Sequence, residues 1–291
     1  MRTLSGRTAV LALPLALALA ACGAETEEPT RAESPQAAAP EPAKQPAEPE
    51  TAEDFLDLAE QAMAEEPAWG FSVKGEEGLT LQGQKSAATY EGTVRRAVGR
   101  TALHAQGVST GSKGTKKTEE LYVVDGAGYL KEGTAGWKAL SPAGPGMRNK
   151  VEDPIAVVEE FRGYARAAGG EVEVTEADGG GTIELRVTSG ERKLSAVRDR
   201  AWAKKAKREF DPTAGQLREA GVPVEDAQMT LSGLEEVLVL DATSYRIRSH
   251  RFEFGFLIPY NGQDIAFEQR VTEENQGPYR GRIELPAGVA G

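Results

Sequence analysis

The chain has 291 residues, and its 34 lysines and arginines against 45 aspartates and glutamates give a formal net charge of -11. This acidity excludes a general nucleic-acid-binding protein, which needs a basic surface, so we expect no nucleic-acid partner. A single cysteine and two histidines exclude a disulfide scaffold and a Cys/His zinc site.

The first 21 residues predict a secretory signal peptide. Arg2 and Arg7 precede a mostly apolar run over 9–21, which is shorter than the roughly 20 residues of a transmembrane helix. The run ends in Leu-Ala-Ala-Cys-Gly, which resembles a bacterial lipobox. The resemblance implies cleavage between Ala21 and Cys22 and attachment of diacylglycerol to the Cys22 thiol. The alternative is a free cysteine that happens to follow a signal peptide.

Residues 22–50 predict a lipidated cysteine followed by a disordered tether. Six prolines, seven glutamates and no aromatic or branched aliphatic residue occur over 23–50, so this stretch cannot bury enough apolar surface to fold. A cleavable propeptide is the alternative. Because two acyl chains hold a protein stably at a bilayer, we expect a lipid-anchored protein on the outer face of the plasma membrane.

Residues 51–291 predict a single folded domain, since no repeat or linker divides them. Thr51-Ala-Glu-Asp has the form of a capping box and begins a helix that Pro67 ends. A run of β-rich segments follows, with Asp125-Gly126 as a tight turn. The predicted strands cover residues 69–73, 78–81, 89–103, 118–124, 129–130 and 137–140.

The second half of the domain predicts two more helical regions and a final group of strands. Asp153-Pro154 begins a helix that ends before Gly169. A basic helix over 194–210 is followed by a short helix near 214–220. The predicted strands cover residues 171–175, 182–188, 235–241, 245–256, 264–271 and 280–285. Because short turns join most neighbours, the sheet should be antiparallel, in an α+β fold.

Aromatic side chains cluster near the C-terminus, where five of the 18 aromatic residues fall within residues 252–267. Alternation places three phenylalanines on one face of one strand, and the strand over 235–241 is apolar on both faces. Either helices cover this face and complete a core, or a cavity lies beneath it. The candidate cavity residues are Leu238, Leu240, Phe252, Phe254 and Phe256.

The folded domain resembles the LolA/LppX-LprG group of bacterial lipoproteins and carriers. The resemblance rests on the segment 121–130 with Trp137-Lys138 beyond it, on Val237-Leu-Val-Leu-Asp-Ala-Thr-Ser-Tyr-Arg-Ile, and on the closing Ile283-Glu-Leu-Pro. It implies a strongly curved antiparallel sheet, an incomplete barrel, with helices packed on its concave side. It also implies an apolar cavity that takes acyl chains.

Two functions agree with this resemblance. The first is a non-enzymatic, monomeric carrier of a lipid, a lipid-linked glycan or another hydrophobic ligand, with no cofactor. The second is an envelope-sensing or protein-interaction module on the same fold, with its interior filled by side chains.

Two further features have weaker functional interpretations. Ser109 lies in a Gly-x-Ser-x-Gly pattern, but a β-rich loop surrounds it in place of the strand-to-helix turn of a hydrolase. We therefore expect no catalytic residue there. The basic stretch over 192–208 is either a surface for anionic lipid headgroups or a solvated helix face that balances an acidic chain.

Overall fold

The computed structural model describes residues 48–99, 102–142, 144, 153–167, 170–176 and 179–289. The predicted signal peptide, with Ala21 and Cys22, and nearly all of the predicted tether lie outside the described residues. Among the helices that are described, none is both long and apolar enough to cross a membrane.

The described part of the chain is an α+β body with four helices and a twelve-stranded sheet. The helices are α1 (Ala52–Ala64), α2 (Val157–Ala165), α3 (Leu194–Val197) and α4 (Ala201–Glu219). The strands are β1 (Ala68–Leu81), β2 (Gln84–Ala97), β3 (Ala102–Thr110), β4 (Lys116–Val124), β5 (Ala127–Glu132), β6 (Lys138–Leu140), β7 (Glu173–Glu176), β8 (Thr182–Ser189), β9 (Arg192–Lys193), β10 (Thr230–Asp241), β11 (Ile247–Tyr260) and β12 (Gln263–Pro278).

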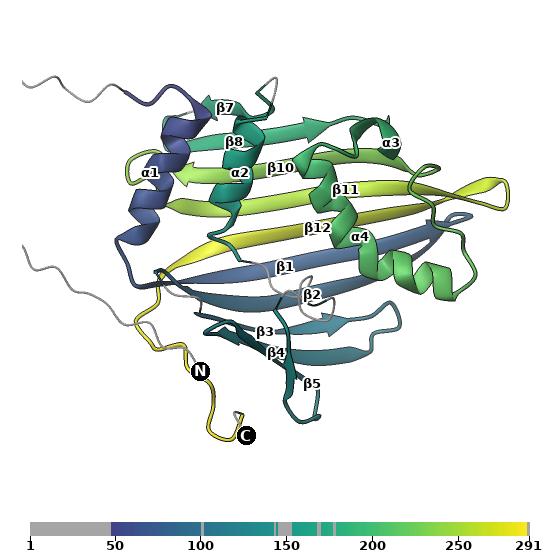
Figure 1. The fold of residues 1–291 in the computed structure, drawn as a ribbon, viewed down its shortest axis with the longest axis horizontal. Helices are drawn as coiled ribbons and strands as arrows, with labels where there is room; N and C mark the ends of the chain where they lie inside the picture. The colour runs from purple at the N-terminus through teal and green to yellow at the C-terminus, as the bar shows by residue number, and fades with distance from the viewer. Residues whose placement is uncertain are drawn as a thin grey trace, which may run out of the picture. The chain divides into compact units, whose positions relative to one another are not determined.

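All the strands belong to one antiparallel sheet. Their order is β6-β5-β4-β3-β2-β1-β12-β11-β10-β8-β7, with β9 paired to β10. Strand β12 lies between β1 and β11, so it joins the early meander to the late one. β6 and β7 remain as edges, and α1, α2 and α4 lie over one face of the sheet (Figure 1). The predicted open antiparallel sheet with helices on one side is confirmed.

The N-terminal helix begins where the sequence predicts. Thr51 Oγ1 accepts a hydrogen bond from the Asp54 amide at 3.2 Å, and Asp54 Oδ2 accepts one from the Thr51 amide at 2.9 Å, so the capping box is formed. Trp69 Nε1 donates to the carbonyl of Met63 at 2.8 Å and fixes the last turn of α1 to the first residues of β1.

The boundaries of the first three strands differ from those that the sequence predicts. Residues 69–73 and 78–81 belong to the single strand β1, while the segment 89–103 divides into β2 and β3. The chain turns near Gly99, whose φ of 76° is in the left-handed region that favours glycine. A single glycine between β-rich residues is a weak turn signal, which explains the wrong prediction of one strand.

Two further predictions are corrected in the C-terminal half. Residues 201–219 form one helix, α4, that continues through Pro212 and bends midway along its length (Figure 1). Phe210 before the proline and Ala214 after it are both fully buried, so packing on the two sides holds the helix together. Residues 280–285 form no strand, because this segment packs against the face of the sheet through the buried Ile283 and does not pair with an edge.

The main core lies between the helices and the sheet. Phe55 and Leu56 from α1, Phe161 from α2 and Phe210 from α4 are buried in one continuous cluster with the inward side chains of the strands. A smaller cluster lies on the opposite face of the sheet, where the C-terminal segment covers it. Its buried members are Ala68, Ala97, Ala102, Tyr122 and Ile283.

Candidate functional site

The five residues predicted as a cavity wall do share one face of the sheet. Leu238 and Leu240 lie on β10, and the three phenylalanines lie on the neighbouring strand β11. In the register, Leu238 faces His250, and Phe252 faces Glu236. All five side chains are between 0 and 3% exposed.

Helix α4 fills the space above these phenylalanines. The ring of Phe210 lies 5.1 Å from that of Phe256 and 4.7 Å from that of Phe267. The Lys205 ammonium lies 4.6 Å above the ring of Phe252, in a cation-π contact. The phenylalanine face is therefore part of the packed core in this structure.

A buried charged network fastens α2 and α4 to the sheet beside these phenylalanines. Glu236 accepts hydrogen bonds from Tyr164 of α2 at 3.0 Å, from Lys205 of α4 at 2.8 Å and from His250 Nε2 at 2.9 Å. His250 Nδ1 lies 3.0 Å from Glu273 Oε2 on β12. We refer to these five residues as the anchor network.

The ionisation states of the anchor network support one another. Burial by itself raises the pKa of Glu236, but the charge of Lys205 and the hydrogen bond from His250 outweigh it and lower that pKa to about 2. Burial by itself lowers the pKa of His250, but its two glutamate partners raise it to about 9. His250 is therefore protonated at neutral pH, and both of its ring nitrogens donate.

The hollow on the helix-bearing side lies between the second half of α4 and strands β1–β4 and β12. Its volume is about 440 Å³. We call it the α4 hollow. The residues that line it from the sheet and the helix are Val73, Gly75, Glu76, Glu77, Ala88, Thr89, Tyr90, Ser109, Glu119, Glu209, Gln216, Gln269, Arg270 and Val271.

Tyr90 forms one wall of the α4 hollow by lying flat along the sheet. A Cβ atom added at Gly107 would come within 2.4 Å of the Tyr90 ring, and one at Gly92 within 2.6 Å of its hydroxyl oxygen. Two glycines on adjacent strands thus leave room for the ring. Burial, with the charge of Glu119 second, raises the pKa of Tyr90.

Two carboxyl groups in the α4 hollow are partly shielded from water. Burial raises the pKa of Glu77, although Thr213 of α4 donates a hydrogen bond to it at 3.2 Å. Burial also raises the pKa of Glu209, against the opposing charge of Arg208, whose Nε lies 3.0 Å from it. The hollow therefore combines apolar side chains and Tyr90 with hydrogen-bonding groups, which suits an amphipathic ligand.

The amino-acid sequence does not indicate the α4 hollow. Its residues come from six elements and carry no common motif, so the only local signal was the glycine pair beneath Tyr90. The position of α4 over the sheet decides which part of the face stays open, and this position follows from long-range packing.

The described residues contain no catalytic arrangement around Ser109. Ser109 lies within β3, opposite Tyr90 and Lys117, and no helix follows it. Glu236 and Glu273 engage both ring nitrogens of His250. His104 is stacked on Tyr122 and held between Arg95 and Glu120, each at 3.2 Å.

Metal-ligating groups are likewise not gathered in the part of the chain that is described. No group of three or more histidine, cysteine, aspartate or glutamate side chains there is placed to hold a metal ion.

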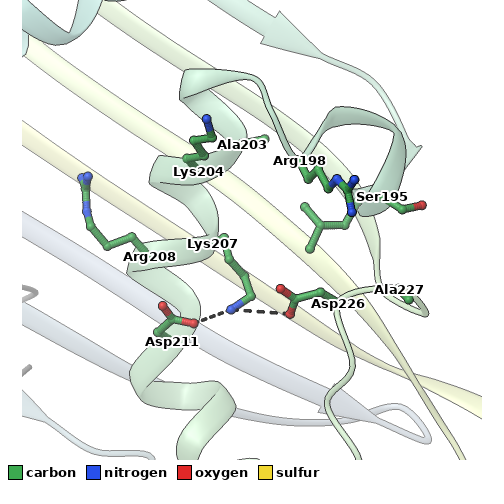
Figure 2. Close-up of a pocket in the computed structure, with 10 residues that line it drawn as sticks. Ser195, Arg198, Ala203, Lys204, Lys207, Arg208, Asp211, Asp226 and Ala227 are labelled. Atoms are coloured by element: carbon green, nitrogen blue, oxygen red, sulfur yellow. Dashed lines mark hydrogen bonds and ion pairs between the residues drawn. The ribbon is translucent and has the colours of Figure 1, made fainter.

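A second pocket, of about 610 Å³, lies between α3, the first half of α4 and the turn around Asp226 (Figure 2). We call it the basic pocket. Its charged side chains are Arg198, Lys204, Lys207, Arg208, Asp211 and Asp226. It shares no lining residue with the α4 hollow.

Comparison with protein-family models found no match, and comparison with curated proteins found none. A β-barrel-like protein of unknown function from Brucella abortus matches 73% of this chain and 99% of its own, at 7% identity and a TM-score of 0.23. A protein described as an outer membrane lipoprotein-sorting domain from Vibrio parahaemolyticus matches 78% and 92%, at 13% identity and a TM-score of 0.28.

The MucA/MucB complex of Pseudomonas aeruginosa also matches, over 81% of this chain and 61% of that one, at 12% identity and a TM-score of 0.26. These likenesses concern the fold alone. The strand order of this chain itself describes the open sheet.

Proposed function

We propose that this chain is a lipid-anchored extracytoplasmic lipoprotein that binds or carries a lipid or another hydrophobic ligand without catalysing a reaction. The ligand would occupy the α4 hollow, and Cys22 would carry the anchor at the outer face of the plasma membrane. The signal-like leader and its lipobox support the location. The α4 hollow is the single observation that supports the binding function.

The size and lining of the α4 hollow suit a ligand with an apolar body and a polar end. Sites for small ligands range from about 300 to 1,000 Å³ and carry a few convergent polar groups. Val73, Val271 and the Tyr90 ring would contact the apolar body, while Glu77 and Gln216 would face the polar end. Burial of apolar surface contributes about 25 cal/mol per Å², so transfer into the hollow needs no directed chemistry.

Filling the α4 hollow from the sheet tests this proposal. Gly75 lies in β1 at the wall of the hollow, and a Cβ atom there would meet Tyr90 Cβ at an ordinary distance of 3.5 Å. We therefore expect Gly75→Leu to fold and to occupy the hollow. In the mature chain, residues 22–291 with Cys22→Ser, this variant should lose co-purifying lipid in native mass spectrometry and uptake of a fluorescent fatty acid.

Lys74→Leu is the matched control, because residue 74 is the exposed neighbour on the same strand and projects from the opposite face. It should keep the lipid binding of the parent chain. If the parent chain carries no lipid and takes up no fatty acid, or if the two variants bind equally, the carrier function is contradicted.

The filled phenylalanine face favours a second function, an envelope-sensing or protein-interaction module. Phe252, Phe254 and Phe256 are packed under α4 and the anchor network, so this part of the interior is closed by the chain itself. This function predicts no lipid in the purified chain. It also predicts that Gly75→Leu leaves binding of a partner protein unchanged.

The membrane anchor has its own test. Cys22→Ser removes the only thiol in the chain, so the full-length variant should fail to incorporate radiolabelled palmitate in bacteria. Equal labelling of the parent chain and the variant would contradict lipidation at Cys22.

A further inference from the structure

We propose that the basic pocket binds a phosphate-type anion, a phosphate monoester or diester carried by a lipid headgroup or by a soluble compound. The proposal concerns a second site, separate from the α4 hollow, and does not depend on the proposed function.

The charge of the basic pocket is opposite to that of the whole protein. Four cationic side chains line it against two aspartates, although one of the four, Arg208, also pairs with Glu160 and Glu209. The chain as a whole carries a formal net charge of -11. Figure 2 shows Arg198 on the segment before α4 and Lys207 on α4 beside the same space, whereas the Arg208 side chain points away from them. Such a local excess of positive charge attracts anions to one place on an otherwise acidic protein.

Two of these cations are available to an incoming anion. Lys204 is exposed, and the described residues provide no ion pair for its ammonium. Among the described residues, Arg198 pairs only with its neighbour Asp199, with Nε 3.9 Å from the carboxylate and both side chains highly exposed. Pairs of this kind contribute little, so a phosphate can replace Asp199 as the partner of Arg198.

The third cation is restrained by the two aspartates of the pocket. Lys207 forms an ion pair with Asp211 and lies 3.5 Å from the carboxylate of Asp226, as the dashed lines in Figure 2 show. These contacts hold the Lys207 ammonium inside the pocket. They also limit the affinity of Lys207 for an anion, so a variant that lacks the charge of Asp226 should bind the anion more tightly.

The first turn of α4 adds a further attraction for anions. The N-cap residue Arg200 makes no capping hydrogen bond through its side chain, and no acidic residue lies in the first turn. Ala203 and Lys204 from this turn line the pocket. The first turn therefore brings no negative charge to the pocket, and the positive end of the dipole of this 19-residue helix lies at this turn.

The floor of the basic pocket is apolar, since Leu194, Ala203 and Ala227 line it beside the charged groups. Apolar neighbours reduce the local screening of charge by water, which strengthens the attraction of a bound phosphate. They would also contact the carbon atoms of the ester group. The pocket thus matches a phosphate ester better than a small inorganic ion alone.

The test uses the mature chain, residues 22–291 with Cys22→Ser, so that no acyl anchor confounds binding. One arm measures co-sedimentation with vesicles of equal parts phosphatidylglycerol and phosphatidylcholine, and with phosphatidylcholine alone. The other arm measures binding of inorganic phosphate by calorimetry. We expect saturable binding in at least one arm. The vesicle arm alone would indicate a lipid headgroup, and the phosphate arm would indicate a soluble source.

Two variants and one control locate the binding. Arg198→Gln with Lys204→Gln should weaken binding about 30-fold, because each basic group near an anionic surface contributes about fivefold. Asp226→Asn should strengthen it, because it removes a negative charge beside Lys207. Lys74→Gln with Arg282→Gln removes the same net charge from exposed positions outside the pocket and should bind like the parent chain.

Three results would overturn the proposal. The first is that the parent chain binds neither the anionic vesicles nor phosphate. The second is that the pocket variant and the control lose binding equally. The third is that Asp226→Asn binds more weakly than the parent chain. Because every substituted side chain is exposed, circular dichroism should show the same fold in all variants.

Discussion

At the scale of single residues, the anchor network consists of charged side chains that are buried in the core. Lys205, Glu236 and His250 are almost completely buried, and each depends on the others to remain charged. The sequence does not indicate that these groups interact, because 31 positions separate Lys205 from Glu236 along the chain. Alternation along β11 could place His250 on the phenylalanine face. Only the docking of α4 brings the lysine to it.

Removal of the buried ammonium should destabilise the fold strongly. Lys205→Met leaves Glu236 without its closest cation, and breaking a buried pair in this way costs about 3–5 kcal/mol. Lys204→Met, the exposed neighbour on the same helix, should change stability by less than about 0.5 kcal/mol. Urea unfolding measures both, and equal midpoints for the two variants would show that the network contributes nothing.

The raised pKa of His250 gives stability a defined pH dependence. Its pKa is about 9 in the folded chain against 6.5 for an unperturbed histidine, so the folded state holds the proton more tightly. This contribution is fully present below pH 6.5 and is lost as the pH rises through about 9. The free energy of unfolding should therefore fall across this range, and the slope should flatten in His250→Gln. An unchanged slope would contradict the assignment.

At the scale of elements, local signals predicted the ends of segments better than their lengths. The capping box at Thr51 and the Asp125-Gly126 turn are both formed, because each depends on atoms a few residues apart. Other features depend on pairing partners and buried side chains elsewhere in the chain. Residues 69–81 form the single strand β1 because of their pairing with β12, and α4 continues through Pro212 because side chains on both sides of it are buried. Local sequence patterns do not indicate such partners.

Loss of the N-cap of α1 should have a moderate effect. Thr51→Ala removes the hydroxyl that accepts from the Asp54 amide, and such a change costs about 1 kcal/mol. Thr134→Ala, in an exposed turn, serves as the control and should be neutral. Thermal unfolding that shows the same midpoint for both variants would mean that the cap contributes no stability.

At the scale of the whole molecule, the sheet is longer than its helices can cover. Figure 1 shows the helices over the strands from β1 across to β8, and the α4 hollow separates the second half of α4 from β3 and β4. The sequence predicted the antiparallel fold with helices on one side, and alternation placed Phe252, Phe254 and Phe256 on one face of one strand. It did not predict where that face is open, because the bend and docking of α4 decide it. The hollow consequently lies beside Tyr90 and away from Phe254.

The location of a bound acyl chain is the most direct test of the proposed function. A crystal structure of the mature chain, with Cys22→Ser and grown with a brominated fatty acid, would place the bromine by its anomalous scattering. The proposal predicts a bromine peak in the α4 hollow, among Val73, Tyr90 and Gln216. An empty hollow, or bromine found only on the outer surface of the sheet, would contradict it.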